Sequence, residues 1–213
     1  MKPLAILGGT FDPVHIGHLR VAWEAAETLD AELRLVPARV PPHRPQPCAS
    51  ADERVALLNA ALAGQSRLVL DTRELRRDGP SWSIDTLADL RLEIGSRRPL
   101  VLLVGSDAFA GLSSWHRWRE IFELAHVGVL ARAGHAPVLP AELETEVALR
   151  QASPEALRAA PAGCIASIAV TPLEISASAI RSLLSAGREP RYLLPDGVLA
   201  NPGLLRPYRC IRA

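Results

Sequence analysis

The sequence predicts an α/β protein built on a doubly wound parallel sheet, with helices covering both faces. Short apolar runs alternate along the whole chain with stretches whose apolar residues recur at helical spacing. The most apolar run, over residues 99–104, is continuous rather than alternating, as expected for a strand covered on both faces. The length of 213 residues suits one domain, and we expect residues 1–213 to form it.

Six strands are predicted, each a short apolar run bounded by turn or loop residues. In chain order they cover residues 4–7, 32–36, 67–70, 99–104, 126–130 and 165–170. Because helical patterns separate them, they are expected to run parallel. Residues 37–50 contain five prolines, which exclude a helix or a central strand there.

Helices are predicted from the spacing of apolar residues and from residues that start or stop a helix. One helix has its apolar face at Leu19–Ala26, a second runs from Ser50 or Asp52 to Gly64, and a third begins near Ser83 or Asp85. A fourth covers Ala141–Gln151, and a fifth has an apolar pattern that begins at Ala177. Asp107 is a candidate cap for a further helix start. Loops are expected over residues 71–81, 131–140 and 152–163, the first of them charged and exposed.

The composition excludes several classes of protein. A net charge of +1 gives no global field for nucleic acid or a membrane, and no apolar run approaches the roughly eighteen residues of a membrane span. The first apolar run breaks at Gly8 and Gly9, unlike a signal peptide. The cysteines are odd in number and far apart, which indicates a reduced, cytoplasmic protein without disulfides or a zinc site (Cys48, Cys164 and Cys210).

The chain cannot depend on lysine side chains to bind anionic ligands, because Lys2 is its only lysine. Such ligands must be held by arginine, histidine, hydroxyl and backbone N–H groups. Arginine suits phosphate because its planar fork binds two oxygens at once.

The loop after the first strand has the features of a phosphate site. Gly8 and Gly9 let the backbone approach a ligand, and the helix that follows offers N–H groups and a partial positive charge. His15 and His18 can each donate a hydrogen bond to a phosphate oxygen. A metal pair and a pair of structural or capping histidines are the alternatives, although no further ligand at useful spacing supports a metal.

Two motifs carry a family resemblance. Gly8-Gly-Thr-Phe-Asp-Pro-Val-His-Ile-Gly-His-Leu19 resembles the first signature of the nucleotidyltransferase superfamily, and Ile175-Ser-Ala-Ser-Ala-Ile-Arg181 resembles its second. Within the superfamily the chain resembles the bacterial nicotinate-nucleotide adenylyltransferases, which implies a Rossmann-like nucleotidyltransferase fold. The ATP-binding residues that this implies are Gly8, Gly9, Thr10, Phe11, His15, His18, Gly105, Asp107, Ser176, Ser178 and Arg181. His15, His18 and Arg181 would be catalytic. Without the resemblance, the two serines would be read as helix caps.

Three further segments resemble that family's mononucleotide site: residues 41–44, 82–87 and 115–118. The resemblance implies that His43 and Arg44 contact phosphate and that Thr86 lies against the pyridine nucleotide. It also implies that Trp115 or Trp118 stacks on the nicotinate ring. Without it, the first segment is a stiff surface linker, and two tryptophans three apart share a helical face in the core.

The implied reaction is adenylyl transfer from ATP to nicotinate mononucleotide, a step of NAD biosynthesis that gives nicotinate adenine dinucleotide and pyrophosphate. Mg²⁺ is the implied cofactor, with no protein ligand identified. The acceptor alternatives are nicotinamide mononucleotide and phosphopantetheine. An alternative of another class is a nucleotide-binding sensor without turnover.

The segments expected around the pyridine ring offer mostly hydrogen-bond donors, which favours nicotinate mononucleotide over its amide form. Asp85 is the one nearby acid, and we expect it to cap its helix rather than contact the substrate. The tail resembles the family's, but Asn201 and Pro202 stand where an aromatic is usual, so its helix is expected to end early. The sequence leaves the oligomeric state open, and a homodimer is compatible with it.

Overall fold

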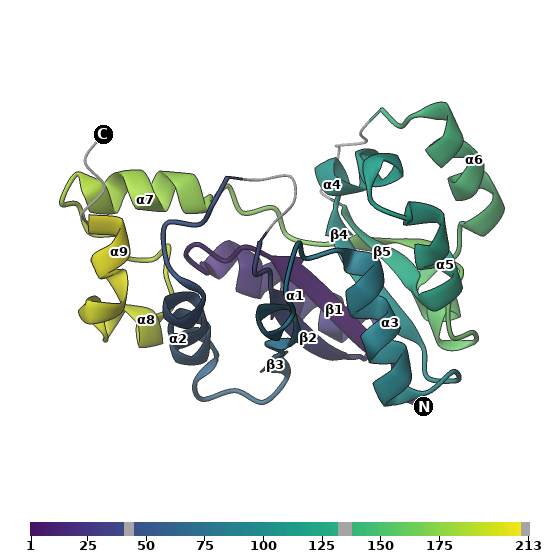
Figure 1. The fold of residues 1–213 in the computed structure, drawn as a ribbon, viewed down its shortest axis with the longest axis horizontal. Helices are drawn as coiled ribbons and strands as arrows, with labels where there is room; N and C mark the ends of the chain where they lie inside the picture. The colour runs from purple at the N-terminus through teal and green to yellow at the C-terminus, as the bar shows by residue number, and fades with distance from the viewer. Residues whose placement is uncertain (41–44, 132–137, 210–213) are drawn as a thin grey trace.

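The computed structural model describes residues 1–40, 45–131 and 138–209, and these form one six-stranded sheet in which all neighbours are parallel (Figure 1). The strands are β1 (Leu4–Gly9), β2 (Glu32–Pro37), β3 (Leu68–Leu70), β4 (Leu100–Gly105), β5 (His126–Ala131) and β6 (Ile165–Ala169). Their order across the sheet is β3-β2-β1-β4-β5-β6. The six predicted strands and their parallel direction are therefore confirmed.

Helices connect the strands as predicted, with extra short turns. They are α1 (Ile16–Thr28), α2 (Ala51–Leu62), α3 (Ser83–Ile94), α4 (Ser106–Ala110), α5 (Ile121–Leu124), α6 (Ala141–Arg150), α7 (Ala177–Ser185), α8 (Asp196–Leu199) and α9 (Arg206–Arg209). Ser50 rather than Asp52 caps α2, in a reciprocal capping box with Glu53. In the described part of the chain, no helix is long and apolar enough to cross a membrane.

Alternation along the strands creates two cores, one on each face of the sheet. In β1, Ala5 and Leu7 belong to the cluster that contains buried residues of α1, α2 and α7. Leu4 and Ile6 point the other way, to the cluster with residues of α3, α4 and α5. Both faces of the sheet are thus covered by helices, which confirms the doubly wound arrangement.

The charged segment 71–81 differs from the exposed loop that was predicted. It contains a short 3₁₀ helix, Arg73–Arg76, and Glu74 in that helix is only 8% exposed. The Asp71 carboxylate accepts a hydrogen bond from Arg73 Nε at 2.8 Å and another from Arg34 of β2. The charges therefore tie the segment to the edge of the sheet.

The topology opens a site between β1 and β4. These strands are neighbours in the sheet, but α1 follows β1 onto one face whereas α4 follows β4 onto the other. Ligands of open α/β sheets bind at such a point, beyond the carboxyl ends of the strands. Gly8 and Gly105 lie at these ends, both exposed, and an added Cβ at either would meet nothing within 4 Å.

The C-terminal helices pack beside α2 at one end of the molecule (Figure 1). α8 is only four residues long, in agreement with the prediction that the helix before Asn201 and Pro202 ends early. Asn201 Nδ2 donates to the carbonyl of Gly197 at 2.8 Å. Gly197 lies against α2 so closely that an added Cβ would be 2.1 Å from the carbonyl oxygen of Ala60. Only glycine fits that contact.

We predict that Gly197→Ala lowers the free energy of unfolding by about 1–3 kcal/mol, the usual scale for overpacking. The added methyl group must push α8 away from α2. Gly203→Ala is the matched control, because an added Cβ there meets nothing within 4 Å. Urea unfolding of both variants measures the difference, and equal stabilities would contradict the close contact.

Candidate active site

His15 and His18 form a reciprocal pair at the start of α1. The backbone N–H of His18 donates to His15 Nδ1 at 3.4 Å, and the N–H of His15 donates to His18 Nδ1 at 3.3 Å. Because each Nδ1 accepts a hydrogen bond, a neutral ring carries its proton on Nε2. The capping alternative is therefore realised through Nδ1, while each Nε2 is in the donor form that phosphate binding requires.

The two imidazoles are stacked, with centroids 3.6 Å apart and planes 24° apart. His15 is 6% exposed, and burial lowers its pKa to about 4, so it is neutral near physiological pH. Phe11, predicted to bind ATP, is 2% exposed, and its ring meets that of His18 edge-on at 5.1 Å. The Phe11 side chain thus belongs to the core and fixes the His18 ring.

The N-terminus of α1 offers fewer N–H groups to an anion than the sequence predicted. The Ile16 N–H donates to the carbonyl of Leu193 at 3.0 Å, and the His18 N–H is used by His15. The expectation of a phosphate held by these backbone groups is therefore wrong for them. The Nε2 atoms of the two imidazoles are not used in this reciprocal pair, which engages only Nδ1.

Asp12 joins three distant segments of the chain. Its carboxylate, 5% exposed for the whole residue, accepts hydrogen bonds from the N–H groups of Cys48 and Ala49 at 2.8 and 3.0 Å. Its carbonyl accepts one from Arg181 Nη1 at 2.7 Å. The first signature, the end of the proline-rich stretch and the second signature therefore meet at one residue.

The second signature begins as predicted, at the start of α7. The Ser176 hydroxyl caps the helix, since it accepts the N–H of Ala179 at 3.1 Å. The Ser178 hydroxyl accepts from Arg181 Nη2 at 3.2 Å. Ser176 thus realises the capping alternative, and Ser178 helps to orient the Arg181 guanidinium.

Arg54 and Tyr208 support this region and were not anticipated. Arg54 is 1% exposed, and its Nη1 donates to the carbonyls of Thr10 and Ala38 at 2.9 and 2.8 Å. Tyr208 of α9 is fully buried, and burial followed by the charge of Asp12 raises the pKa of its phenol. For Arg54 a signal existed: it lies three and four residues before Leu57 and Leu58, on the buried face of α2.

The proline-rich stretch starts and ends at the first signature. At its start, the Ala38 N–H donates to the carbonyl of Gly9 at 2.9 Å. At its end, the N–H groups of Cys48 and Ala49 donate to the Asp12 carboxylate. His43 and Arg44, predicted to contact phosphate, lie outside the described residues. The ends of the stretch are compatible with that prediction.

A second group of aromatic residues lies at the start of α3. The rings of Trp82 and His116 are 5.1 Å apart. The Ser81 hydroxyl accepts the N–H of Arg39 at 2.9 Å, which brings the start of the proline-rich stretch to the same place. Trp82 is the N-cap residue of α3 and no side chain caps this helix, so the expectation that Asp85 caps it is wrong.

The hydroxyl of Thr86 is used inside the protein. Thr86 is 1% exposed, donates to Glu74 Oε1 at 2.7 Å and accepts from Arg77 Nη1 at 3.3 Å. Burial raises the pKa of Glu74. A nucleotide that lies against this segment would therefore meet backbone groups or neighbouring side chains rather than the Thr86 hydroxyl.

The two tryptophans of Trp-His-Arg-Trp do not share a helical face. Arg117 between them has φ 53°, in the left-handed region, so the chain turns before Trp118 begins a 3₁₀ turn. Trp118 is 7% exposed and packs edge-on against Phe122 at 6.3 Å. Trp118 is thus a core residue, and the half-buried Trp115 is the candidate of the two for stacking.

The loop after β4 also differs from its prediction. Asp107 is the second residue of α4, and Gly105 is the N-cap residue without a side-chain cap. Asp107 is exposed beside the carboxyl end of β4, whereas the Ser106 hydroxyl turns inward and donates to the carbonyl of Leu130 at 3.1 Å. Gly105 and Asp107 are thus both exposed where β4 passes into α4.

Comparison with known proteins agrees with this arrangement. A family model described as cytidylyltransferase-like matches residues 6–183. A relative from Halorhodospira halophila, named probable nicotinate-nucleotide adenylyltransferase, is 51% identical over 93% of this chain and 91% of its own length. A relative of the same name from Pseudomonas fluorescens is 49% identical over 93% of this chain and 94% of its own length.

Solved structures share the fold over the whole chain. A Plasmodium falciparum nicotinic acid mononucleotide adenylyltransferase complexed with NaAD has a TM-score of 0.71 at 16% identity, covering 99% of this chain and 97% of that one. A putative nicotinate-nucleotide adenylyltransferase from Vibrio parahaemolyticus has a TM-score of 0.62 at 17% identity, with 99% and 98% coverage. The chain belongs to the cytidylyltransferase-like family and, within it, to the nicotinate-nucleotide adenylyltransferases.

Proposed function

We propose that this protein transfers the adenylyl group of ATP to nicotinate mononucleotide, with nicotinate adenine dinucleotide and pyrophosphate as products. The observation that carries the proposal is the 2.7 Å hydrogen bond from Arg181 to the carbonyl of Asp12. It brings the arginine of the second signature to the loop that leads into His15 and the start of α1. The names of relatives about 50% identical supply the substrates.

In the proposed reaction, a 5′-phosphate oxygen of the mononucleotide attacks the α-phosphorus of ATP. The bond from that phosphorus to the bridging oxygen breaks, and pyrophosphate leaves with the electron pair. The attacking phosphate is anionic near neutral pH, so no strong general base is required. His15 and His18 would donate from Nε2 to the α- and β-phosphates, and Arg181 would bind the leaving pyrophosphate.

Divalent metal enters this proposal as part of the nucleotide substrate, with Mg²⁺ bound to ATP. In the described part of the chain, no three His, Cys, Asp or Glu side chains gather as metal ligands. The Asp12 carboxylate is used by two backbone N–H groups. The donor set therefore fits a magnesium ion held by phosphate and water rather than by the protein.

The start of α3 suits the carboxylate of the acid substrate. The first N–H groups of a helix lack partners within it, and no side chain caps this one. A negative charge is also favoured there by the helix dipole. Trp115 is half-buried and directly precedes His116, whose ring lies 5.1 Å from that of Trp82. This segment therefore offers N–H donors beside an aromatic plane. We propose that the nicotinate ring binds here.

The remaining expectations form part of the proposal. Residues 1–213 would act as one nucleotidyltransferase domain in the cytoplasm, without nucleic-acid or membrane partners. A homodimer is compatible with the proposal. Light scattering of the purified chain, with and without substrates, would measure the oligomeric state.

The substrate panel tests the function. We predict pyrophosphate release with ATP and nicotinate mononucleotide, and a kcat/KM roughly 10- to 100-fold lower with the nicotinamide form. One unmatched polar contact costs about 1–3 kcal/mol, because the amide NH₂ would face N–H donors. Phosphopantetheine is the control acceptor. A preference for it would reject the substrate, and no release with any acceptor would favour the sensor alternative.

His18→Asn and His18→Ala separate the two roles of this histidine. The asparagine oxygen can accept the N–H of His15 in place of Nδ1, but asparagine cannot replace the Nε2 donor. We predict that both variants lose roughly 10²–10³-fold in kcat, the scale for one transition-state donor. The melting temperature should fall less for His18→Asn. Normal turnover by either variant would show that Nε2 does not contact the reacting phosphates.

Arg181→Lys keeps the charge but loses the two-pronged geometry. Arg181 uses Nη1 for the carbonyl of Asp12 and Nη2 for Ser178, and a lysine cannot make both contacts while also binding phosphate. We predict a lower kcat and, in parallel, weaker inhibition by pyrophosphate. If lysine preserves both quantities, Arg181 acts as a point charge only.

A further inference from the structure

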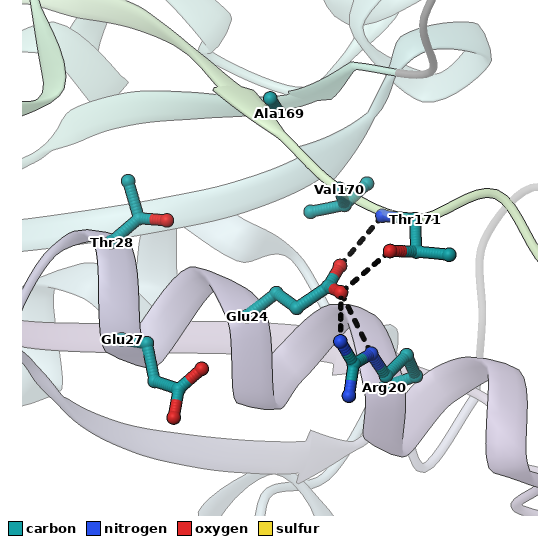
Figure 2. Close-up of a pocket in the computed structure, with 7 residues that line it drawn as sticks. All are labelled: Arg20, Glu24, Glu27, Thr28, Ala169, Val170 and Thr171. Atoms are coloured by element: carbon teal, nitrogen blue, oxygen red, sulfur yellow. Dashed lines mark hydrogen bonds and ion pairs between the residues drawn. The ribbon is translucent and has the colours of Figure 1, made fainter.

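Glu24 of α1 connects the helix of the first signature to the chain that leads into the second. Figure 2 shows its carboxylate between Arg20, on the same helix, and Thr171, two residues beyond the end of β6. The Glu24 side chain is only 14% exposed. No part of the proposed reaction uses it, and the sequence motifs do not include it.

Both oxygens of Glu24 are occupied by donors. Oε2 accepts the backbone N–H of Thr171 at 2.6 Å, and Oε1 accepts the Thr171 hydroxyl at 2.7 Å. Arg20 adds hydrogen bonds to Oε1 from Nε at 2.7 Å and from Nη2 at 2.6 Å. The hydroxyl and N–H of Thr171, followed by Arg20, lower the pKa of Glu24, so the carboxylate stays charged near neutral pH.

The chain after Thr171 follows α1 back to its start. Gly17 and Glu24 are seven residues apart, two turns along the same face and about 10 Å apart on the axis. A Cβ added to Gly17 would be 3.6 Å from Cβ of Ile175, the first residue of the second signature. The five residues from Thr171 to Ile175 thus run antiparallel to α1, held by Glu24 at one end and packed on Gly17 at the other.

We propose that Glu24 is a positioning residue for adenylyl transfer, because its carboxylate fixes the segment that leads to Arg181, whose guanidinium bonds to Asp12 in the first signature. A shift of Thr171 along α1 would be transmitted through this short segment to the start of α7. Misplacement by about 1 Å, even by a residue remote from the chemistry, can cost roughly 10²-fold in rate. The inference rests on the proposed function for its kinetic consequence, not for its geometry.

The groove beside Glu24 does not itself have the character of a ligand site. It is lined by Arg20, Glu24, Glu27, Thr28, Ala169, Val170 and Thr171 (Figure 2). Its charged side chains bind one another or neighbouring residues: Glu27, for example, accepts from Trp23 Nε1 at 2.9 Å and pairs with Arg67 at 3.4 Å. The polar groups of the groove thus hold two protein segments together.

Glu24→Gln tests the proposal, because the NH₂ group of the glutamine must face one of the groups that donate hydrogen bonds to the Glu24 carboxylate. We expect kcat/KM for ATP to fall roughly 10- to 100-fold, with KM for nicotinate mononucleotide unchanged. Glu27→Gln is the matched control: it removes a charge from the same helix and groove without touching Thr171, and should resemble the wild type. Wild-type kinetics for Glu24→Gln would overturn the proposal.

A double-mutant cycle separates positioning from general destabilisation. If Glu24 acts through Arg181, then Glu24→Gln must cost much less in an Arg181→Lys background than in the wild type. Equal losses in both backgrounds would overturn the proposal. If Glu24→Gln does not fold, Thr171→Val removes one bond, and Thr171→Ser restores the hydroxyl. Valine is expected to lower the rate and serine to preserve it, and equal rates would again reject the role.

ATP affinity, measured by calorimetry without an acceptor, keeps this inference distinct from the proposed function. Glu24→Gln should bind ATP more weakly than Glu27→Gln and the wild type. If the wild type binds ATP but releases no pyrophosphate, the proposed function fails while this comparison still decides the role of Glu24. Equal ATP affinities in all three proteins would overturn the positioning role.

Discussion

The burial of one carboxylate, that of Asp12, constrains the whole site. A buried charge is costly unless partners compensate it. Here the partners are backbone N–H groups of Cys48 and Ala49, with the Arg181 guanidinium 3.9 Å away. These groups come from three parts of the chain, so satisfying Asp12 requires them to assemble. The geometry that phosphate chemistry needs is therefore also the geometry that folding favours.

The architecture was predictable because its signals are local. Apolar runs bounded by turn or loop residues marked the strands, and Ser50 was one of two candidate caps for α2 because a capping signal depends on neighbouring residues only. The two signatures follow β1 and β6, and parallel strands end at the same edge of the sheet. The helical face expected to be shared by Trp115 and Trp118 was wrong, because the position of Trp118 depends on the left-handed turn at Arg117 and on packing against Phe122. The spacing of the two tryptophans reveals neither contact.

The supporting residues of the site were less accessible to sequence reasoning. Glu24 and Thr171 are 147 positions apart, and each alone is an ordinary polar residue near a surface. Thr86 was correctly placed at the start of α3, yet its hydroxyl bonds to Glu74, from a segment read as an exposed loop. Motifs identify groups that meet a ligand, whereas groups that hold those motifs in place are defined by long-range contacts.

The burial of Tyr208 next to Asp12 has a consequence for biosynthesis. On a ribosome the signature loop emerges first, but the phenol that packs beneath it is added 196 residues later. At about 5–20 residues per second, this interval lasts roughly 10–40 s. During translation the loop therefore lacks part of its final packing, and the edge that carries both signatures is completed only when α9 has left the exit tunnel. Premature termination before α9 would leave a chain with both signatures but an unfinished core.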